Sequence, residues 1–261
     1  MRRSKNGKEL YFLWEGQKNV NDIRLIETQS TLQLNDELNE KIESEWNRIA
    51  EKNPNVWDAP KWRTEFVHED SELLCIYVSP ISYSQHNVMR HITGQPMQFY
   101  PNPITVNTVQ ETADGYILIG VKGKGSDQKG LGLVGSGFVE RYADKEGVSK
   151  KPESLGFVVQ KECLQETVYN KKKDFYMDDA SAMAVIFGSS HDTTVGFYLP
   201  LFATHDEVDI SNNEHDDLLL LPTNNDDIFD VLNQGSYKGI TASDHLLGCL
   251  ESYVRLKSKE Q

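Results

Sequence analysis

The sequence is poor in cysteine and contains no long apolar run. Among its 261 residues are only three cysteines, at positions 75, 163 and 249, and they form no CxxC pair. This odd, scattered set argues against a disulfide framework and indicates a reduced, cytoplasmic compartment. No apolar stretch approaches the roughly 18 residues that a membrane span needs, so no membrane partner is expected. The basic start, MRRSKNGKEL, is followed by no long apolar region and is not expected to be a signal peptide.

Positive charge is also scarce. Forty acidic residues against 27 basic ones give a formal net charge of −13. A protein of this charge lacks the basic surface that sequence-independent nucleic-acid binding requires, so no nucleic-acid partner is expected. An anionic small molecule remains compatible, because a local basic pocket or a bound cation can reverse the field at one site.

What the chain does have is enough apolar material for a sizeable core. Apolar residues make up 38% and aromatic residues 10%, which suits one large domain or two small ones. Periodicity and turn residues predict strands and helices in irregular alternation. Strands are expected at 8–16, 22–30, 61–67, 72–80, 181–189, 194–204 and 218–222, and helices at 35–53, 82–92, 152–169, 226–234 and 243–257.

Residues 101–123 read as two strands around an Asp-Gly turn, which is a strong hairpin signal. A glycine-rich segment, 123–140, and a polar insert, 141–151, follow. The mixture of elements predicts an α+β fold with three layers, an α/β/α sandwich on a mixed sheet. Residues 1–100 are expected to form an N-terminal α/β extension that packs on a core of residues 101–261.

The helix expected at 152–169, PESLGFVVQKECLQETVY, is apolar on two sides. Pro152 and Glu153 suit its first turn. One side carries Leu155, Val158, Val159 and Cys163, and the other carries Phe157, Leu164 and Val168. A helix with two apolar sides is expected to lie between two layers of the fold.

Glu162, Gln165 and Glu166 are i, i+3 and i+4 neighbours beside the first apolar side of this helix. Carboxylates in that position are costly unless they are paired or bind a metal ion. The alternative is that the last turns of the helix reach water and both glutamates are solvated, which is common for glutamates at this spacing.

The frame around these glutamates fits G-x5-E-x7-R-E-U-x-E-E-x-G-U, where U is a bulky aliphatic residue. Gly147 and Glu153 begin the match, and KECLQETVY at 161–169 ends it. The segment thus resembles the Nudix hydrolase box, with Glu162 and Glu166 at matching positions. Lys161, Gln165 and Val168 stand where the box has Arg, Glu and Gly.

A second match to the start of the box lies upstream. In GSGFVE, Gly135, Gly137 and Glu140 resemble the G-G-x-x-E turn of the family, which would make 141–151 an insertion between turn and helix. Further upstream, residues 39–67 resemble the Nudix subgroup typified by UDP-glucose pyrophosphatase. The residues that carry this likeness are Trp46, Trp57, Asp58, Lys61, Trp62 and Arg63. The resemblance spans roughly residues 40–256.

The resemblance implies a Nudix-type pyrophosphohydrolase that uses Mg²⁺, with Mn²⁺ as an alternative. Glu166 would be the main metal ligand, and Glu162 a second ligand or the base that activates water. Gln165 would offer only a neutral carbonyl oxygen. A further carboxylate would come from Asp216 or Glu214 in the acidic loop, whose other interpretation is a solvated turn.

Four more residues are predicted to contact the substrate. Lys122 and Arg63 are candidate phosphate contacts, or else surface charges, and Gly137 and Glu140 belong to the glycine turn. Trp57 and Trp62 either line a base or sugar pocket or are buried in the core.

The implied reaction is hydrolysis of a nucleoside diphosphate linked to another moiety. A UDP-sugar such as UDP-glucose, giving UMP and a sugar 1-phosphate, is the favoured substrate. The alternative is a catalytically weak or silent Nudix-fold module that binds a nucleotide or a protein, which Gln165 and Val168 favour. The sequence leaves the oligomeric state open.

Three further motifs carry no assignment. GLGLVG, 130–135, satisfies G-x-G-x-x-G but lies in no clear βαβ unit. SSHDTT, 189–194, places Ser, His and Asp side by side, which says little about a triad assembled across a fold. His86 and His91 are five residues apart and lack a clear third ligand for zinc.

Overall fold

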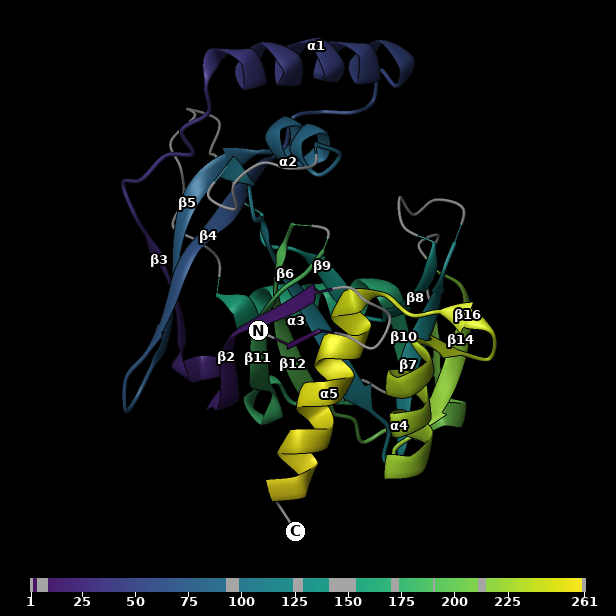
Figure 1. The fold of residues 1–261 in the computed structure, drawn as a ribbon. Coiled ribbons are helices and arrows are strands. Elements are labelled where there is room, and N and C mark those ends of the chain that lie inside the picture. The colour runs from purple at the N-terminus through teal and green to yellow at the C-terminus, as the bar shows by residue number, and fades with distance from the viewer. Residues whose placement is uncertain are drawn as a thin grey trace.

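The computed structural model describes residues 2–3, 9–92, 99–123, 129–140, 154–169, 174–189, 191–210 and 215–259. Its centre is one mixed sheet with helices on both faces, below a smaller part that carries α1 and α2 (Figure 1). The expected α+β architecture is therefore confirmed.

The central sheet runs in the order β1-β2-β11-β12-β6-β7-β14, with β8 paired to β7 and β9 paired to β6. β12 and β6 are parallel, and the other neighbouring pairs are antiparallel. The sheet is thus mixed, as predicted. Its strands are β1 (Arg2–Arg3), β2 (Glu9–Asn19), β6 (Ile104–Glu111), β7 (Tyr116–Lys122), β8 (Gly130–Leu133), β9 (Ser136–Phe138), β11 (Ser181–Phe187), β12 (Thr193–Pro200) and β14 (His215–Pro222).

Helices cover the two faces of this sheet. α3 (Leu155–Glu166) packs Leu155 and Val159 into one core cluster, together with strand residues such as Val106. α4 (Asn225–Gln234) and α5 (Asp244–Lys259) pack against a second cluster that includes Leu246 and Ile119, and they lie in front of the sheet in Figure 1. Two separate cores on opposite faces of one sheet make the α/β/α sandwich.

A three-stranded sheet, in the order β3-β5-β4, carries the helical part seen at the top of Figure 1. α1 packs on α2 through Leu38, Ile42, Val88 and Met89. β2, in contrast, pairs with β11 in the central sheet, so the first hundred residues contribute to both sheets. The boundary near residue 100 stays a prediction. The elements here are β3 (Ile23–Glu27), α1 (Asp36–Lys52), β4 (Pro60–Glu69), β5 (Leu74–Ser82) and α2 (Tyr83–Met89).

The remaining elements are short. Two small antiparallel pairs, β10 with β13 and β15 with β16, flank the central sheet. They are β10 (Thr167–Tyr169), β13 (Val208–Ile210), β15 (Ser236–Tyr237) and β16 (Ile240–Thr241), and the 3-10 helices are η1 (Val20–Asp22), η3 (Met177–Asp179) and η4 (His205–Glu207).

α3 is shorter than the helix predicted at 152–169. It begins after Ser154, whose hydroxyl accepts a hydrogen bond from the amide of Phe157 at 3.2 Å, and it ends at Glu166. Thr167 and the two residues after it form β10 instead, because β-branched and aromatic side chains favour extended backbone where a partner strand is present. Pro152 and Glu153 lie outside the described residues.

The expected position of this helix between two layers is wrong. Phe157 and Leu164, on its second apolar side, are 50% and 55% exposed, so only the side with Leu155 and Val159 is covered. Of the two tryptophans considered for a pocket, Trp62 is fully buried in the core and Trp57 is 65% exposed.

All three cysteines are buried free thiols. Within the described ranges, no helix has both the length and the apolar character needed to cross a membrane.

The predicted Asp-Gly hairpin is present between β6 and β7. Gly115 adopts a φ of 84°, and its amide donates to the carbonyl of Thr112 at 3.0 Å. Asp114 accepts hydrogen bonds from the backbone amide of His205 at 2.9 Å and from the His205 ring. The turn residue thus fastens the hairpin to η4.

This contact predicts a bell-shaped pH dependence of stability. Slight burial opposes ionisation of Asp114, but hydrogen bonds from His205 and Thr112 outweigh it and lower the pKa of Asp114 to about 2. The hydrogen bond to Asp114 raises the pKa of His205 above 6.5. The contribution of Asp114 is lost as the pH falls from about 4 towards 2, and that of His205 is lost as the pH rises through its raised pKa.

We therefore expect Asp114→Asn to lower the free energy of unfolding most between about pH 4 and 6.5, with smaller losses on either side. Urea denaturation of both proteins across this range measures the difference. A loss that is the same at every pH would contradict the assigned ion pair.

Candidate functional site

The carboxylate of Glu166, at the last residue of α3, is buried against the turn between β8 and β9. The residue is 2% exposed. Its Oε2 accepts hydrogen bonds from the amides of Gly135 at 2.6 Å and Ser136 at 3.3 Å, and it lies 3.2 Å from Nε2 of His215. Gly135 has a φ of 81°, a conformation that glycine adopts without strain, and two successive amides thereby face one anion.

Glu166 is ionised in this environment. Burial opposes ionisation, but the hydrogen bond from His215, the positive charge of Lys122 and the amide of Gly135 together hold its pKa below the ordinary value of 4.5. All three hydrogen bonds to this carboxylate within the described residues go to Oε2. Oε1 is buried and has no hydrogen-bond partner among the described residues. A buried carboxylate oxygen without a partner is costly, and a bound cation would remove that cost.

Glu162, one helical turn earlier, places its carboxylate over Gly137 of β9. A Cβ atom on Gly137 would lie 2.6 Å from Oε1 of Glu162, so this position accepts no side chain while Glu162 stays in place. The Glu162 side chain is 12% exposed, and Oε1 lies 3.5 Å from Nζ of Lys161. The glycine turn and the helix thus bring both predicted glutamates to the same side of α3.

Lys122, at the end of β7, lies near Glu166. Its charge contributes to the lowered pKa of Glu166. Its side chain crosses Gly132 of β8, where an added Cβ would lie 2.8 Å from Cε. Gly132 and Gly135, two glycines of the GLGLVG motif, therefore serve close packing and a turn around Glu166.

Asp216 and Gln165 lie at the exposed edge of this arrangement. Asp216 sits at a β-bulge in β14, and its Oδ1 lies over Gly123, 2.5 Å from where a Cβ would be. Gln165 is exposed on α3. Their roles as metal ligands stay predictions, and Glu214, Gly147 and Glu153 lie outside the described residues.

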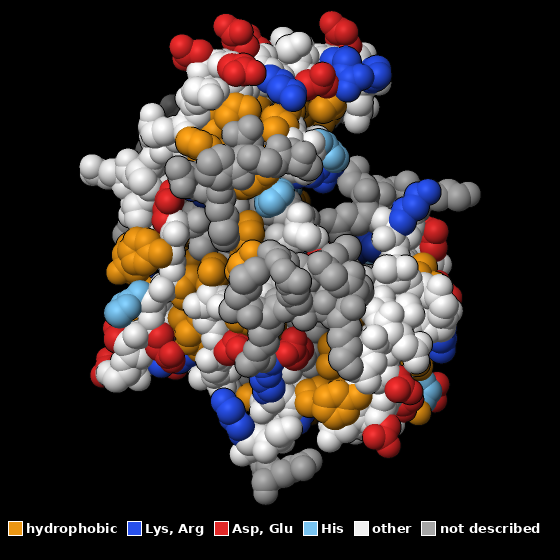
Figure 2. Space-filling view, viewed as in Figure 1, with side chains coloured by type: hydrophobic (Ala, Val, Ile, Leu, Met, Phe, Trp, Pro, Cys, Tyr) orange, Lys and Arg blue, Asp and Glu red, His pale blue; other side chains and the backbone are white. Residues whose placement is uncertain are grey.

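Arg63 and Glu140 each make an ion pair at the junction with the smaller part. Arg63 is 9% exposed in β4, and its Nη1 lies 3.1 Å from Oε1 of Glu65. Glu140 accepts a hydrogen bond from Nζ of Lys61 at 3.1 Å, which joins β4 to the segment after β9. Figure 2 shows the surface hollowed between the part with α1 and α2 and the core below. Contacts of Arg63 and Glu140 with a substrate stay predictions.

The donors fit a cation that is shared with a substrate. In the described ranges, no group of three or more His, Cys, Asp or Glu side chains is arranged to hold a metal ion. Mg²⁺ does not need such a cage, because one or two carboxylates suffice when waters and substrate phosphates complete its six positions. Oε1 of Glu166 and the carboxylate of Glu162 meet this smaller requirement.

A buried polar network supports the turn from the other side of Ser136. The Ser136 hydroxyl donates to Oδ1 of Asn107 at 2.8 Å, and Nδ2 of Asn107 donates to the hydroxyl of Thr194 at 3.2 Å. That hydroxyl lies 2.8 Å from Nδ1 of His245, whose Nε2 lies 2.7 Å from Asp192. The amide of Ser136, which faces Glu166, is therefore held by a hydrogen-bonded chain across the sheet.

Sequence reasoning missed His215 and this network. His215 was visible only as part of an acidic loop, although it is 4% exposed and opens β14. Asn107, Thr194 and His245 belong to separate elements that only the fold brings together. The one available signal was glycine within a strand, at Gly120 and Gly132, since such glycines often mark a close approach of other groups.

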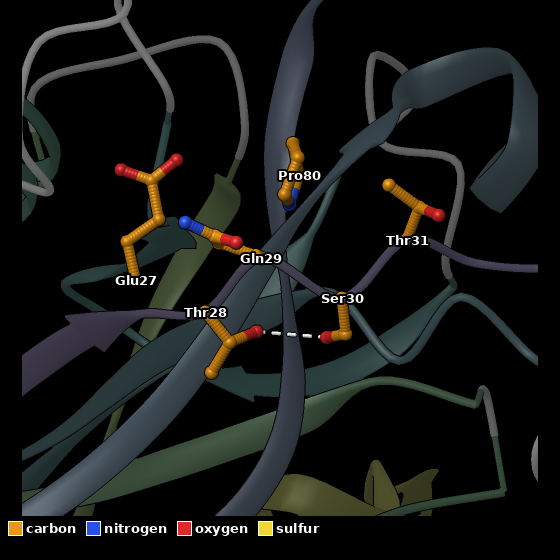
Figure 3. A pocket seen from close by; sticks show the side chains of 6 residues that line it. All are labelled: Glu27, Thr28, Gln29, Ser30, Thr31 and Pro80. Carbon is orange, nitrogen blue, oxygen red and sulfur yellow. Dashed lines mark hydrogen bonds between the residues drawn. The ribbon is translucent and has the colours of Figure 1, made fainter.

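A hollow of about 420 Å³ lies elsewhere, along residues 27–31 and Pro80 (Figure 3). Thr28 and Ser30 share a hydrogen bond there at 2.7 Å, and Ser30 donates to Glu65 at 2.9 Å. Its described lining includes no Lys, Arg or His, so it offers nothing to neutralise a phosphate.

No protein-family model matches the sequence, and no curated protein matches it either. Among solved structures, the chain is similar to DR0079 of Deinococcus radiodurans at 14% identity and a TM-score of 0.38, covering 57% of this chain and 80% of that one. It is similar to an Ap4A hydrolase of C. elegans at 11% identity and a TM-score of 0.36, covering 60% of this chain and 98% of that one.

A third similar structure is the NUDIX domain of Shewanella oneidensis NrtR in complex with ADP ribose. The identity is 18% and the TM-score 0.34, covering 63% of this chain and 94% of that one. At such TM-scores and identities, these likenesses establish neither a family nor an activity. The geometry around Glu166 carries the functional argument.

The two glycines of the turn predict different outcomes on substitution. Gly135→Ala would place a Cβ 2.8 Å from Sγ of Cys163 and force an L side chain into the left-handed region, so we expect a loss of about 1–3 kcal/mol in the free energy of unfolding. Gly137→Ala would displace only the partly exposed Glu162 side chain, so a smaller loss is expected. Urea denaturation compares the two, and equal losses would contradict the described turn.

Proposed function

We propose that this chain is a Nudix-type pyrophosphohydrolase that cleaves a nucleoside diphosphate linked to another moiety, with a UDP-sugar such as UDP-glucose as its substrate. The observation that carries the proposal is the environment of Glu166, a buried carboxylate with one oxygen held by three donors and the other without a hydrogen-bond partner among the described residues. The resemblance of 147–169 to the Nudix box supports the same assignment.

Each residue has a defined task in this proposal. Glu166 and Glu162 would hold Mg²⁺, which when bound neutralises phosphoryl oxygens and orients water. Glu162, the more exposed of the two acids, would accept the proton of an attacking water if it does not bind the ion. Lys122 supplies positive charge beside Glu166, where the diphosphate of an anionic substrate would lie. Water adds to one phosphorus, the bridging P–O bond breaks, and UMP and a sugar 1-phosphate leave.

The acidic chain as a whole repels a diphosphate, so binding of the substrate depends on the charges close to Glu166. A net charge of −13 disfavours the approach of an anion. One lysine against the carboxylates of Glu162 and Glu166 leaves the site itself anionic until a divalent cation binds. Substrate binding is therefore expected to require the cation, which is the behaviour of a site whose ion is shared with the substrate.

The first test is the release of UMP from UDP-glucose, followed by ³¹P NMR or chromatography. We expect release that depends on Mg²⁺, is stopped by EDTA, and falls at least about a hundredfold in Glu166→Gln, because several kcal/mol of charge stabilisation are lost. Glu43→Gln, an exposed glutamate on α1, is the matched control and should retain activity.

A wild-type protein that turns over no member of a panel of UDP-sugars, other nucleotide sugars, ADP-ribose and CoA would sink the enzyme assignment. Binding of one of these without turnover would favour the silent module instead.

The second test addresses Gln165, which stands where the Nudix box has a carboxylate. Gln165→Glu adds a hard oxygen ligand at an exposed position, so it should strengthen metal binding and raise the rate at limiting Mg²⁺ without lowering stability. Gln160→Glu is the matched control, because it makes the same charge change on the same helix at another exposed position on a different side. Equal Mg²⁺ dependence in the two variants would show that position 165 does not face the ion.

A further inference from the structure

Two paired glycines leave a part of the central sheet near Glu166 without side chains. Gly120 of β7 is the register partner of Gly132 of β8. A Cβ on Gly120 would lie 2.7 Å from Cγ of His215 and closer still to other atoms of its ring. The imidazole therefore lies directly on the backbone of β7, in space that any other residue at position 120 would fill.

The position of His215 over Gly120 is fixed by its strand, β14. It begins β14, pairs in register with Lys122, and precedes the β-bulge at Asp216. The residue is 4% exposed. Nε2 lies 3.2 Å from Oε2 of Glu166, whereas Nδ1 has no hydrogen-bond partner in the described part of the chain. Within the described residues, the hydrogen bond of this buried ring is thus directed at Glu166.

We propose that His215 is a positioning residue for Glu166, which sets the carboxylate so that Oε1 faces a divalent cation. A carboxylate that holds a cation is ionised and can only accept, so in the proposed arrangement Nε2 of His215 is the nitrogen that donates to Oε2. With the amides of Gly135 and Ser136, this donor occupies Oε2 from a third direction and stops the carboxylate from turning. Oε1 is then the oxygen left for an ion. This inference rests on the proposed function, since it assigns Oε1 to the proposed Mg²⁺.

The same contact explains why the glycines are needed. A donor that approached Glu166 from the solvent side would leave both itself and the carboxylate in contact with water. His215 reaches it from inside the sheet, which keeps Oε2 dry and its hydrogen bonds strong. Outer partners of metal ligands usually orient the ligand in this way, and their loss costs about 10- to 100-fold in metal affinity.

The test measures Mn²⁺ binding to the full-length protein without substrate, by the loss of the free Mn²⁺ signal in electron paramagnetic resonance. Mn²⁺ prefers the same oxygen ligands as Mg²⁺. We expect saturable binding that is lost in Glu166→Gln and weakened about 10- to 100-fold in His215→Leu. His215→Gln should recover most of the affinity, because the glutamine amide reaches the position of Nε2. His86→Leu, which removes another buried imidazole, should bind as the wild type does.

Two further variants keep the test decisive if His215→Leu does not fold. Gly120→Ala pushes the ring away and should weaken Mn²⁺ binding while His215 is still present. His215→Asn carries an amide that is too short to reach Oε2, so it should bind more weakly than His215→Gln. Cooperative thermal melts confirm that each protein compared is folded.

The outcomes separate this inference from the proposed function. Wild-type turnover and Mn²⁺ binding with equal affinities in folded His215→Leu, His215→Gln and the wild type would overturn the role of His215 alone. Equal affinities in His215→Asn and His215→Gln would overturn it as well. A wild type that neither binds Mn²⁺ nor hydrolyses any substrate would overturn the proposed function and this inference with it.

Discussion

The three hydrogen bonds to Oε2 of Glu166 are the interaction on which the site depends. They connect the last turn of α3, the turn between β8 and β9, and the first residue of β14. A buried carboxylate without such donors would be protonated or would cost several kcal/mol. If any of these three segments moved far, the buried carboxylate would lose a donor and the folded state would lose stability. The site is therefore as rigid as the sandwich around it, and rigidity is what a metal ligand requires.

The glycines of the site follow from the same constraint. Gly135 provides the turn that aims two amides at the acid, Gly137 leaves room for Glu162, and Gly132 leaves room for Lys122. Two of them, Gly132 and Gly135, belong to the GLGLVG segment, whose spacing matches a dinucleotide motif. What all three share is that each lets a charged side chain approach the backbone closely. This explains why β8 and β9 contain glycine, a residue that ordinarily weakens a strand.

Much of the architecture could be predicted because it depends on local signals. The hairpin at Asp114 and Gly115 follows from turn chemistry, and α1 follows from its cap at Asn35 and its apolar spacing. The end of α3 could not be predicted, because Thr167 is extended only by virtue of its pairing with β13, which is distant in sequence. Tertiary pairing overrides helical periodicity at such a boundary.

The candidate site was predictable in part for the same reason. Glu162 and Glu166 share a helix, so their spacing alone placed them together. His215 joins them through a strand 49 residues away, and Asn107 and His245 support Ser136 from two other elements. No pattern within one segment predicts a contact between residues so far apart in the sequence. A glycine inside a strand is the local signal that another group approaches the backbone there.

The most direct measurement is a crystal structure of the protein soaked in Mn²⁺, with the ion located by its anomalous scattering. The account predicts one ion on Oε1 of Glu166 within reach of the Glu162 carboxylate, while Oε2 keeps its bonds to Gly135, Ser136 and His215. An ion bound elsewhere, or an Oε1 that remains without an ion at saturating Mn²⁺, would contradict it.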